Sequence, residues 1–151
     1  MADHVKTVVT NRKARYDYHI EDTLEAGLVL QGTEVKALRE GKANLQDAFC
    51  RAEHGEMRLL NAHISPYSHG NVNNHDPLRP RKLLLHRRQI ERWAKAVQKS
   101  QYTIIPLKIY FKNGYAKVEI GLAKGKKQYD KRADIAERET QRRLDRTLKQ
   151  Y

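Results

Sequence analysis

The sequence contains a single cysteine, Cys50, and no long run of apolar residues. One cysteine cannot form an internal disulfide bond, which fits the reducing cytosol, and a free cysteine usually packs as a small hydrophobic side chain. Apolar runs such as residues 83–85 are only three residues long, whereas a membrane-spanning helix needs about 20. Residues 1–9 include Asp3 and His4 and lack the apolar core of a signal peptide. We therefore expect a cytoplasmic protein with a buried cysteine and no membrane partner.

The residue patterns of known catalytic and metal sites are also missing. His63, His69 and His75 recur every six residues, a spacing that fits neither helix nor strand, and zinc sites usually use closer pairs of ligands. There is no G-x-S-x-G motif for a nucleophilic serine. Residues 121–127 look like a phosphate-binding loop, but only three residues separate the glycines and no Ser or Thr follows Lys126. We expect no enzyme activity, metal ion or cofactor, and interpret this segment as a flexible basic joint.

Positive charge is what the sequence has in excess. Its 151 residues include 30 Lys or Arg against 18 Asp or Glu, giving a formal net charge of +12 and a pI of about 9.9. Such a surface gains binding free energy by releasing counterions from a polyanion. Nucleic acid is the natural candidate, because no bulky amphipathic or apolar segment accompanies the charge to hold a membrane. The length fits one domain with a short appendage.

Residues 102–122 carry the clearest structural signal. Apolar and polar residues alternate on both sides of Asn113 and Gly114, and a period of two is typical of a β-strand. Asn and Gly tolerate the positive φ that a tight hairpin turn requires. This segment predicts an antiparallel hairpin.

Weaker patterns predict four more strands. A second hairpin is expected over residues 45–64, with its turn at 53–56. A third strand pair is expected at residues 16–20 and 27–30, joined by the acidic stretch 21–25. The chain would then hold about six strands.

Two helices are expected beside these strands. Residues 33–39 predict a short helix that Gly41 would end, because glycine commonly follows the last residue of a helix. A longer helix is expected after Pro80, from Leu83 onward, because its apolar residues recur on one helical face. That face consists of Ile90, Trp93, Ala94 and Val97.

The last residues of the chain, 124–151, differ from the rest in composition. They hold ten Lys or Arg and five Asp or Glu, a net charge of +5, and their only large aliphatic residues are Ile135, Leu144 and Leu148. So few apolar side chains cannot offset the entropy cost of ordering, and alone the tail should be disordered. Acidic residues nevertheless precede basic ones by four positions, which favours a helix. Two interpretations stay open: a latent helix that forms when phosphates neutralise the charge, and a solvated helix beside the body.

Aromatic residues stand among basic ones in two segments, 12–18 and 126–132. RNA favours this combination, because exposed bases stack on flat side chains and the backbone attracts Lys and Arg. Taken alone, each segment is more often an ordinary solvated stretch than a binding site.

At these segments the sequence resembles the family of SsrA-binding proteins, also called small protein B (SmpB), which partner transfer-messenger RNA (tmRNA, SsrA RNA) in bacterial ribosome rescue. Four blocks carry the resemblance, in the family's order and spacing. The blocks are residues 11–18 (NRKARYDY), 27–47 (GLVLQGTEVKALREGKANLQD), 79–85 (RPRKLLL) and 121–139 (GLAKGKKQYDKRADIAERE).

The resemblance implies an OB-type β-barrel over residues 1–123, with antiparallel strands and two to three flanking helices, and a basic tail over residues 124–151. The barrel would hold the tRNA-like domain of tmRNA and deliver this RNA to stalled ribosomes for trans-translation, which tags the nascent chain for degradation. The tail would be disordered when free and helical in the empty mRNA channel, near the decoding centre of the small subunit. Elongation factor Tu would be an indirect partner, through the charged RNA.

Carried over by position, the resemblance implies two sets of functional residues. The tmRNA-binding set is Asn11, Arg12, Arg15, Tyr16, Glu25, Leu84 and Lys117. The ribosome-binding set is Gly125, Lys126, Lys127, Gln128, Tyr129, Asp130, Lys131 and Arg132. Glu25 is unexpected because a carboxylate repels phosphate, although it could accept hydrogen bonds from base amino groups. Leu84 could equally be a core residue.

Charge and strands alone would also fit an OB-type ribosome-associated protein, a module like an initiation factor, or a basic hydrolase that cleaves RNA. Binding of a tRNA-like domain transcript without cleavage would remove the hydrolase. Preference for that transcript over canonical tRNA would remove the generic RNA binder.

Overall fold

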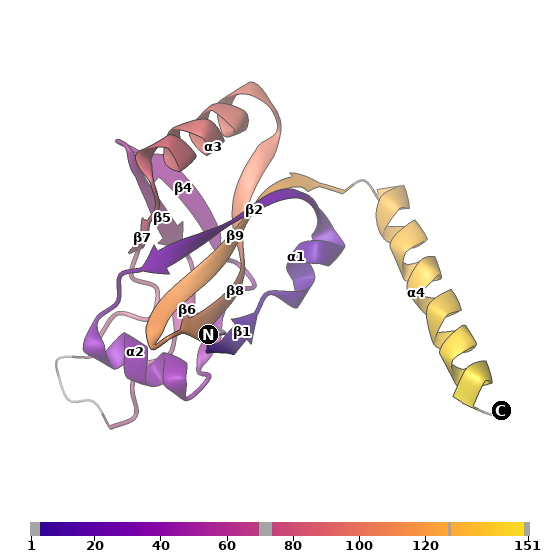
Figure 1. The fold of residues 1–151 in the computed structure, drawn as a ribbon, viewed down its shortest axis with the longest axis horizontal. Helices are drawn as coiled ribbons and strands as arrows, with labels where there is room; N and C mark the ends of the chain where they lie inside the picture. The colour runs from indigo at the N-terminus through magenta and orange to yellow at the C-terminus, as the bar shows by residue number, and fades with distance from the viewer. Residues whose placement is uncertain (1–3, 70–73, 127, 150–151) are drawn as a thin grey trace.

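The computed structural model describes residues 4–69, 74–126 and 128–149 of the chain. It consists mainly of β-strands, with helices placed around them (Figure 1). The strands are β1 (Val5–Thr10), β2 (Tyr18–Leu28), β3 (Ala43–Asn44), β4 (Phe49–Glu53), β5 (Glu56–Leu60), β6 (His63–Ile64), β7 (Arg81–Leu84), β8 (Tyr102–Lys112) and β9 (Tyr115–Gly125). The helices are α1 (Arg12–Asp17), α2 (Gly32–Arg39), α3 (Arg87–Lys99) and α4 (Gln128–Lys149).

Antiparallel pairings close most of the strands into a ring. In order around the ring, β8 pairs with β4, β4 with β5, β5 with β7, β7 with β2, β2 with β9, and β9 again with β8. The long strand β8 also pairs with β1, through residues 108–112 of β8. Its pairing with β4 is limited to Ile104. The prediction of a mainly β, antiparallel fold with flanking helices is confirmed.

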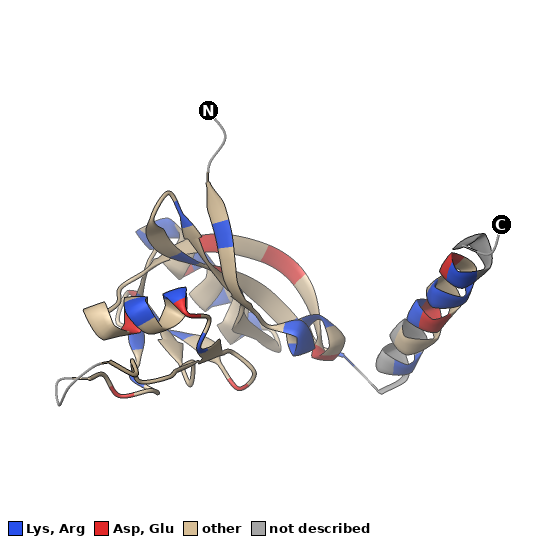
Figure 2. Cartoon of the chain, turned by 90° about the horizontal axis from the view of Figure 1, so that it is seen from below, with Lys and Arg blue, Asp and Glu red and all other residues tan. Residues whose placement is uncertain are grey.

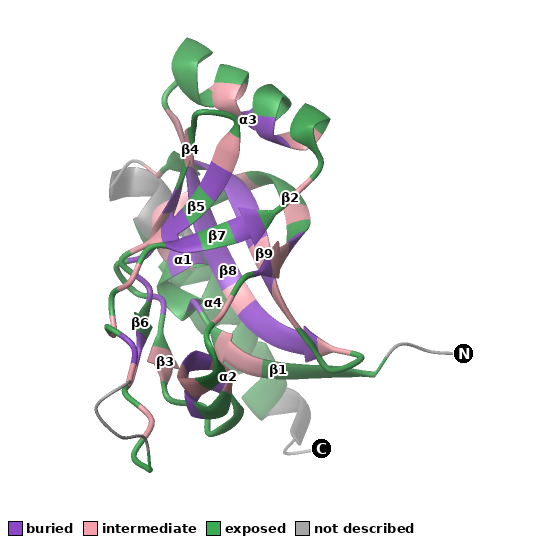
Figure 3. Cartoon of the chain, turned by 90° about the vertical axis from the view of Figure 1, so that its left-hand side faces the viewer, coloured by how far each residue is buried: buried purple, intermediate pink, exposed green. Residues whose placement is uncertain are grey.

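The inside of the ring holds the hydrophobic core. Residues along a strand alternate between the two faces of a sheet. The register sets Val118 of β9 between Ala26 of β2 and Ile109 of β8, and all three are fully buried. Figure 3 shows the buried residues concentrated on the ring strands. Cys50 belongs to this core, where burial raises the pKa of its thiol, so the prediction that it packs as a hydrophobic side chain is confirmed.

Both predicted hairpins are present. Asn113 and Gly114, with φ of 51° and 85°, join β8 to β9. His54 and Gly55, with φ of 53° and 74°, join β4 to β5. Positive φ at both central residues matches the twist of the paired strands, which is why such turns suit hairpins. The β4–β5 hairpin is shorter than predicted, because residues 63–64 pair with β3 instead.

The predicted strand pair at residues 16–20 and 27–30 is wrong. The single strand β2 includes the acidic residues between them and pairs with β9 along nearly its whole length. Charged residues do not end a strand when their side chains reach solvent. Glu21 and Glu25 are exposed, whereas Leu24 packs against the core.

The helix predictions hold for α2 and in part for α3. Gly41, just past α2, has a φ of 73°, the left-handed conformation that commonly ends a helix. The sequence places the start of the longer helix at Leu83, but α3 begins at Arg87, because Leu83 lies in β7 with its side chain in the core. The predicted apolar face of α3 runs outward from the core in the order Trp93, Ile90, Ala94 and Val97.

A buried ion pair joins α2 to β7. The side chains of Glu34 and Arg81 are both 0% exposed, and Arg81 Nε donates to Glu34 Oε2. Arg79 Nη2 donates to the other carboxylate oxygen at 2.7 Å. Burial alone would raise the pKa of Glu34, but hydrogen bonds from Arg79, the Gln31 N–H and Arg81 outweigh burial and lower it. Arg81 Nη1 also donates to the carbonyl of Ala62 at 2.7 Å, so this pair anchors several segments.

The C-terminal helix α4 projects away from the ring (Figure 1). No helix in the described ranges is long and apolar enough to cross a membrane. Residues 128–149 form the helix α4 in the chain alone, and that the tail is helical on the ribosome stays a prediction. That the tail is disordered when free stays a prediction.

Candidate nucleic-acid interface

A row of directly opposite residues crosses neighbouring strands on the outside of the ring. Leu84 of β7 lies opposite Gly27 of β2, and Lys117 of β9 lies opposite both Gly27 and Tyr110 of β8. Directly opposite residues of an antiparallel pair have side chains on the same face. The next residue of β9, Val118, is fully buried in the core, so the row lies on the outer face. We call Leu84, Gly27, Lys117 and Tyr110 the outer row.

Leu84 is a surface residue. Its side chain lies over Gly27, whose missing Cβ would come within 3.1 Å of Leu84 Cβ, and Leu84 is still 57% exposed. The alternative that it belongs to the core is wrong, because Leu83, the preceding residue of β7, points inward instead. Leu84 therefore offers an exposed apolar surface across Gly27 from Lys117.

A second row lies two residues further along the same strands. Glu119 of β9 stands opposite both Glu25 of β2 and Lys108 of β8. Lys108 Nζ lies 3.7 Å from Glu119 Oε2 and 5.5 Å from the centroid of the Tyr110 ring. Two carboxylates, Glu25 and Glu119, thus stand side by side in this row, and Lys108 lies next to Glu119.

Glu25 is tied to two neighbours on β8. The Tyr110 hydroxyl donates to Glu25 Oε2, and Lys112 Nζ lies 3.4 Å from Glu25 Oε1. The hydrogen bond from Tyr110 is the largest influence on the Glu25 pKa, and with the charges of Lys112 and Lys117 it lowers that pKa against the effect of burial. Burial and the Glu25 carboxylate raise the pKa of Tyr110, so its hydroxyl remains a donor. The carboxylate is fixed in place and part of its charge is offset by cations.

Helix α1 packs on the outer face at the far end of β8 and β9. Its Ala14 is buried against Ile105, Leu107 and Ala123. Arg12 and Arg15 are exposed, and Tyr16 is half-buried. Strand β1 and helix α1 have no counterpart among the predicted elements, and they bring these side chains beside the sheet.

Asn11 attaches the start of α1 to the body. Its Nδ2 donates to the carbonyls of Pro106 at 3.0 Å and Leu45 at 3.3 Å, and its backbone N–H donates to the Leu107 carbonyl at 2.7 Å. The residue is only 9% exposed. Its side-chain NH₂ is occupied by the protein, which makes Asn11 a positioning residue for Arg12 and Arg15.

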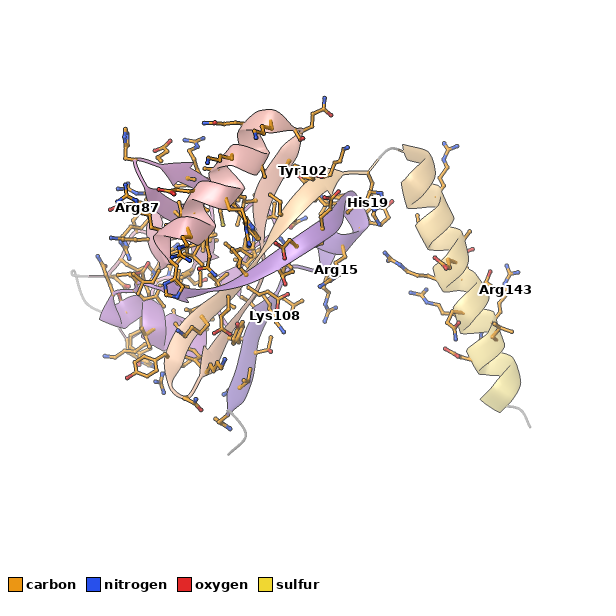
Figure 4. The ribbon with its side chains drawn as sticks, turned by 45° about the horizontal axis from the view of Figure 1, so that its top comes forward. Arg15, His19, Arg87, Tyr102, Lys108 and Arg143 are labelled. Atoms are coloured by element: carbon orange, nitrogen blue, oxygen red, sulfur yellow. The ribbon has the colours of Figure 1, made fainter. Side chains whose placement is uncertain are left out.

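The joint between body and tail is held by α1. The Lys126 N–H donates to the Asp17 carbonyl at 2.9 Å, and Lys126 Nζ donates to the Arg15 carbonyl at 2.9 Å. The guanidinium of Arg138 on α4 lies 5.8 Å from the centroid of the Tyr16 ring. In Figure 4, Arg15 projects from α1 beside β2, and Arg143 projects from the side of α4 that faces away from the body.

The structure describes the side chains of only some of the predicted ribosome-binding residues. Gly125 and Arg132 are exposed and Lys126 is half-buried. Lys127 lies outside the described residues, and so do the side chains of four further residues at the start of α4. Those residues are Gln128, Tyr129, Asp130 and Lys131.

Several residues of this surface are absent from the predicted set. Lys108, Tyr110, Lys112 and Glu119 lie on the alternating hairpin, and their polar positions on β8 and β9 were the signal available in the sequence. Figure 2 shows basic residues spread over α1, α2, α4 and the strands rather than confined to one element. No group of three or more His, Cys, Asp or Glu in the described ranges could hold a metal ion. The surface offers cations, an apolar side chain and fixed hydrogen-bond acceptors.

Comparisons with known proteins found a matching family model, similar sequences and a similar solved structure. The family model described as SmpB protein matches residues 8–150. The chain is 59% identical over 144 residues to an SsrA-binding protein of Enterococcus faecalis, covering 95% of this chain and 94% of the relative. It is 57% identical over 145 residues to an SsrA-binding protein of Geobacillus thermodenitrificans, covering 96% and 94%. A solved structure described as "tmRNA-SmpB: a journey to the center of the bacterial ribosome" is similar at a TM-score of 0.68 and 51% identity, covering 80% of this chain and 85% of that one.

Proposed function

Because the chain belongs to the SmpB protein family, we propose that it binds SsrA RNA and delivers this RNA to stalled ribosomes for trans-translation. The delivery rescues the ribosome and tags the nascent chain for degradation. The similarity to a solved tmRNA–SmpB structure on the bacterial ribosome supports both partners. A ribosome-associated protein of this kind acts in the cytoplasm.

The RNA-binding surface combines the outer row with α1. An exposed leucine and a lysine on the same face suit an unstacked base and its phosphate, and Leu84 and Lys117 provide these groups on either side of Gly27. The fixed carboxylate of Glu25 accepts from base amino groups, while Lys112 offsets its charge toward phosphate. The proposed tmRNA-binding residues are Asn11, Arg12, Arg15, Tyr16, Glu25, Leu84 and Lys117, with Asn11 acting through its hold on α1.

The basic tail binds the second partner, the ribosome. Residues 124–151 carry a net charge of +5, and a basic helix fits a channel lined by ribosomal RNA, because each cation releases counterions from phosphate. The mRNA channel near the decoding centre is the proposed place for this helix. The proposed residues are Gly125, Lys126, Lys127, Gln128, Tyr129, Asp130, Lys131 and Arg132.

The protein acts by binding and leaves its RNA intact. The surface around the outer row is made of cations, carboxylates tied to them, Tyr110 and Leu84, and it offers recognition of bases and phosphates. Elongation factor Tu joins the complex through the charged RNA.

Replacing Leu84 tests the RNA surface. Leu84→Ala removes the exposed apolar side chain and should weaken binding of the tRNA-like domain about fivefold to tenfold, because covering part of a leucine contributes roughly 1 to 1.5 kcal/mol. Fluorescence anisotropy with a labelled tRNA-like domain transcript measures the change.

Leu78 supplies the matched control. It is 51% exposed, close to the 57% of Leu84, and lies in the segment before β7 rather than on the outer row. Leu78→Ala should leave the dissociation constant unchanged. Equal losses in the two variants would show that the outer row has no special part in RNA binding.

A further inference from the structure

Helix α3 carries a stripe of basic side chains that the proposed RNA and ribosome surfaces leave unused. Arg88, Arg92, Lys95 and Lys99 follow one another at spacings of four, three and four residues, which places them in line on one side of a helix. We call these four residues the α3 stripe. All four are exposed. The one acidic residue of α3, Glu91, pairs with Arg87 at 3.1 Å outside the stripe.

The stripe faces away from the body on a helix that is firmly attached. Trp93 and Ile90 bury the opposite side of α3, and Trp93 is only 1% exposed. A helix fixed in this way presents its outer cations at set spacings, and from Arg88 to Lys99 they extend over about 16 Å at a rise of roughly 1.5 Å per residue. A rigid row of charge of this length spans several phosphates of a nucleic-acid backbone.

Most cations of the stripe form no ion pair with the described residues of the protein. In the part of the chain that the structure describes, Arg92 has one long ion pair, 3.6 Å from Asp22 of β2, and Arg88, Lys95 and Lys99 have none. Like charges three and four residues apart repel one another and destabilise a helix. Repulsion among the cations of the stripe therefore destabilises α3, and binding of a polyanion would reduce this repulsion.

The stripe adjoins the proposed RNA surface. Arg92 reaches Asp22 on β2, the strand that carries Glu25 and Gly27. A groove at the start of α3 is lined by Leu84 of the outer row, by Arg87, and by Lys82, which pairs with Glu56 of the same groove at 3.4 Å. An RNA strand that leaves the outer row along this groove therefore meets α3 next.

We propose that the α3 stripe binds the sugar-phosphate backbone of a second stretch of the same SsrA RNA that the outer row holds. This proposal rests on the proposed function. It extends the RNA-binding surface from the outer row on the ring to helix α3. Contacts to phosphate carry no sequence information and position the RNA. The stripe sets the direction in which the bound RNA leaves the protein.

The test compares two full-length double variants that differ from the unmodified chain by the same charge. Arg88→Gln with Lys95→Gln removes two cations of the α3 stripe, and Gln is a good helix former, so α3 should stay folded. Lys36→Gln with Lys42→Gln removes two exposed cations on and just after α2, which lies at the opposite end of the body from α3 in Figures 1 and 3. Circular dichroism checks the fold of both.

Dissociation constants for full-length SsrA RNA are measured from 50 to 300 mM salt, roughly the range over which phosphate contacts act strongly. The stripe variant should bind about tenfold or more weakly at low salt, with a salt slope shallower by roughly 1.4 to 1.8 because two phosphates are no longer neutralised. The α2 variant should stay close to the unmodified chain. Equal losses in both variants would overturn the proposal in favour of a general charge effect.

Two other outcomes also decide the matter. A stripe variant that keeps its RNA affinity but loses association with ribosomes overturns the proposal, because the occupant would then be ribosomal. If the unmodified chain itself fails to bind SsrA RNA, the proposed function fails first. The two failures are thus distinguishable.

Discussion

A chain that ends at Lys126 is expected to keep its affinity for the tRNA-like domain and to lose tagging of nascent chains on stalled ribosomes. Ending there preserves the hydrogen bonds from Lys126 to Asp17 and Arg15, so α1 and the outer row stay as they are. Removing α4 also removes the guanidinium of Arg138 from the face of the Tyr16 ring. A surface cation–π interaction contributes about 0.5 to 1 kcal/mol, so the dissociation constant should change by no more than about fivefold.

Anisotropy with the tRNA-like domain and an in vitro tagging assay on ribosomes stalled without a stop codon give the two readouts. Leu84→Ala is the reciprocal variant, since it should lose RNA affinity while α4 is intact. A large loss of RNA affinity in the shortened chain would contradict the division of labour between ring and tail.

Arg81→Met is expected to destabilise the fold by about 3 to 5 kcal/mol, the usual effect of removing one partner of a buried ion pair. The substitution leaves the buried carboxylate of Glu34 with only Arg79 and the Gln31 N–H as donors. It also leaves the Ala62 carbonyl without its guanidinium donor. The free energy of unfolding in urea measures the effect.

Arg79 provides the comparison within the same cluster. Its side chain is 29% exposed, so Arg79→Met should cost clearly less than Arg81→Met. Combining Arg81→Met with Glu34→Leu should recover part of the loss, because no unpaired buried charge then remains. If Arg81→Met cost no more than Arg79→Met, the buried pair would not be a main support of this side of the fold.

The same pair gives the fold a defined response to acid. The pKa of Glu34 is lowered in the folded chain, so its contribution to stability is present above the ordinary glutamate pKa of about 4.3 and is lost as the pH falls through the lower folded value. Urea unfolding of the Arg81→Met, Glu34→Leu chain should therefore show a weaker loss of stability below about pH 4 than the unmodified chain.

Local signals in the sequence predict the elements that depend on local chemistry. The β8–β9 hairpin follows from alternation around Asn113 and Gly114, and α2 follows from Gly41 beyond its end. The sequence does not show that the acidic side chains of β2 point to solvent, so residues 21–25 resemble a loop. The sequence therefore predicts two strands where the structure has one. The start of α3 is predicted too early because a short apolar run fits a strand and a helix alike.

Apart from the aromatic and basic segment 12–18, the candidate site could be predicted only through the family resemblance, because its geometry depends on distant pairings. Tyr110 and Glu25 are 85 residues apart, and no local pattern connects them. Leu84 is exposed only because the register of β7 points Leu83 inward and sets Leu84 over Gly27. The resemblance implies that Asn11 faces RNA, but its hydrogen bonds to β8 and Leu45 give it a structural part as well.

The proposed function requires that this chain recognise the tRNA-like domain of SsrA RNA by binding alone. Such recognition is measured by equilibrium binding of the full chain to a labelled tRNA-like domain transcript, in competition with unlabelled canonical tRNA and with the RNA checked for cleavage. We predict tight binding that excess tRNA displaces poorly, with the transcript recovered intact. Equal displacement by tRNA would show a general RNA binder, and cleavage of the transcript would show a nuclease.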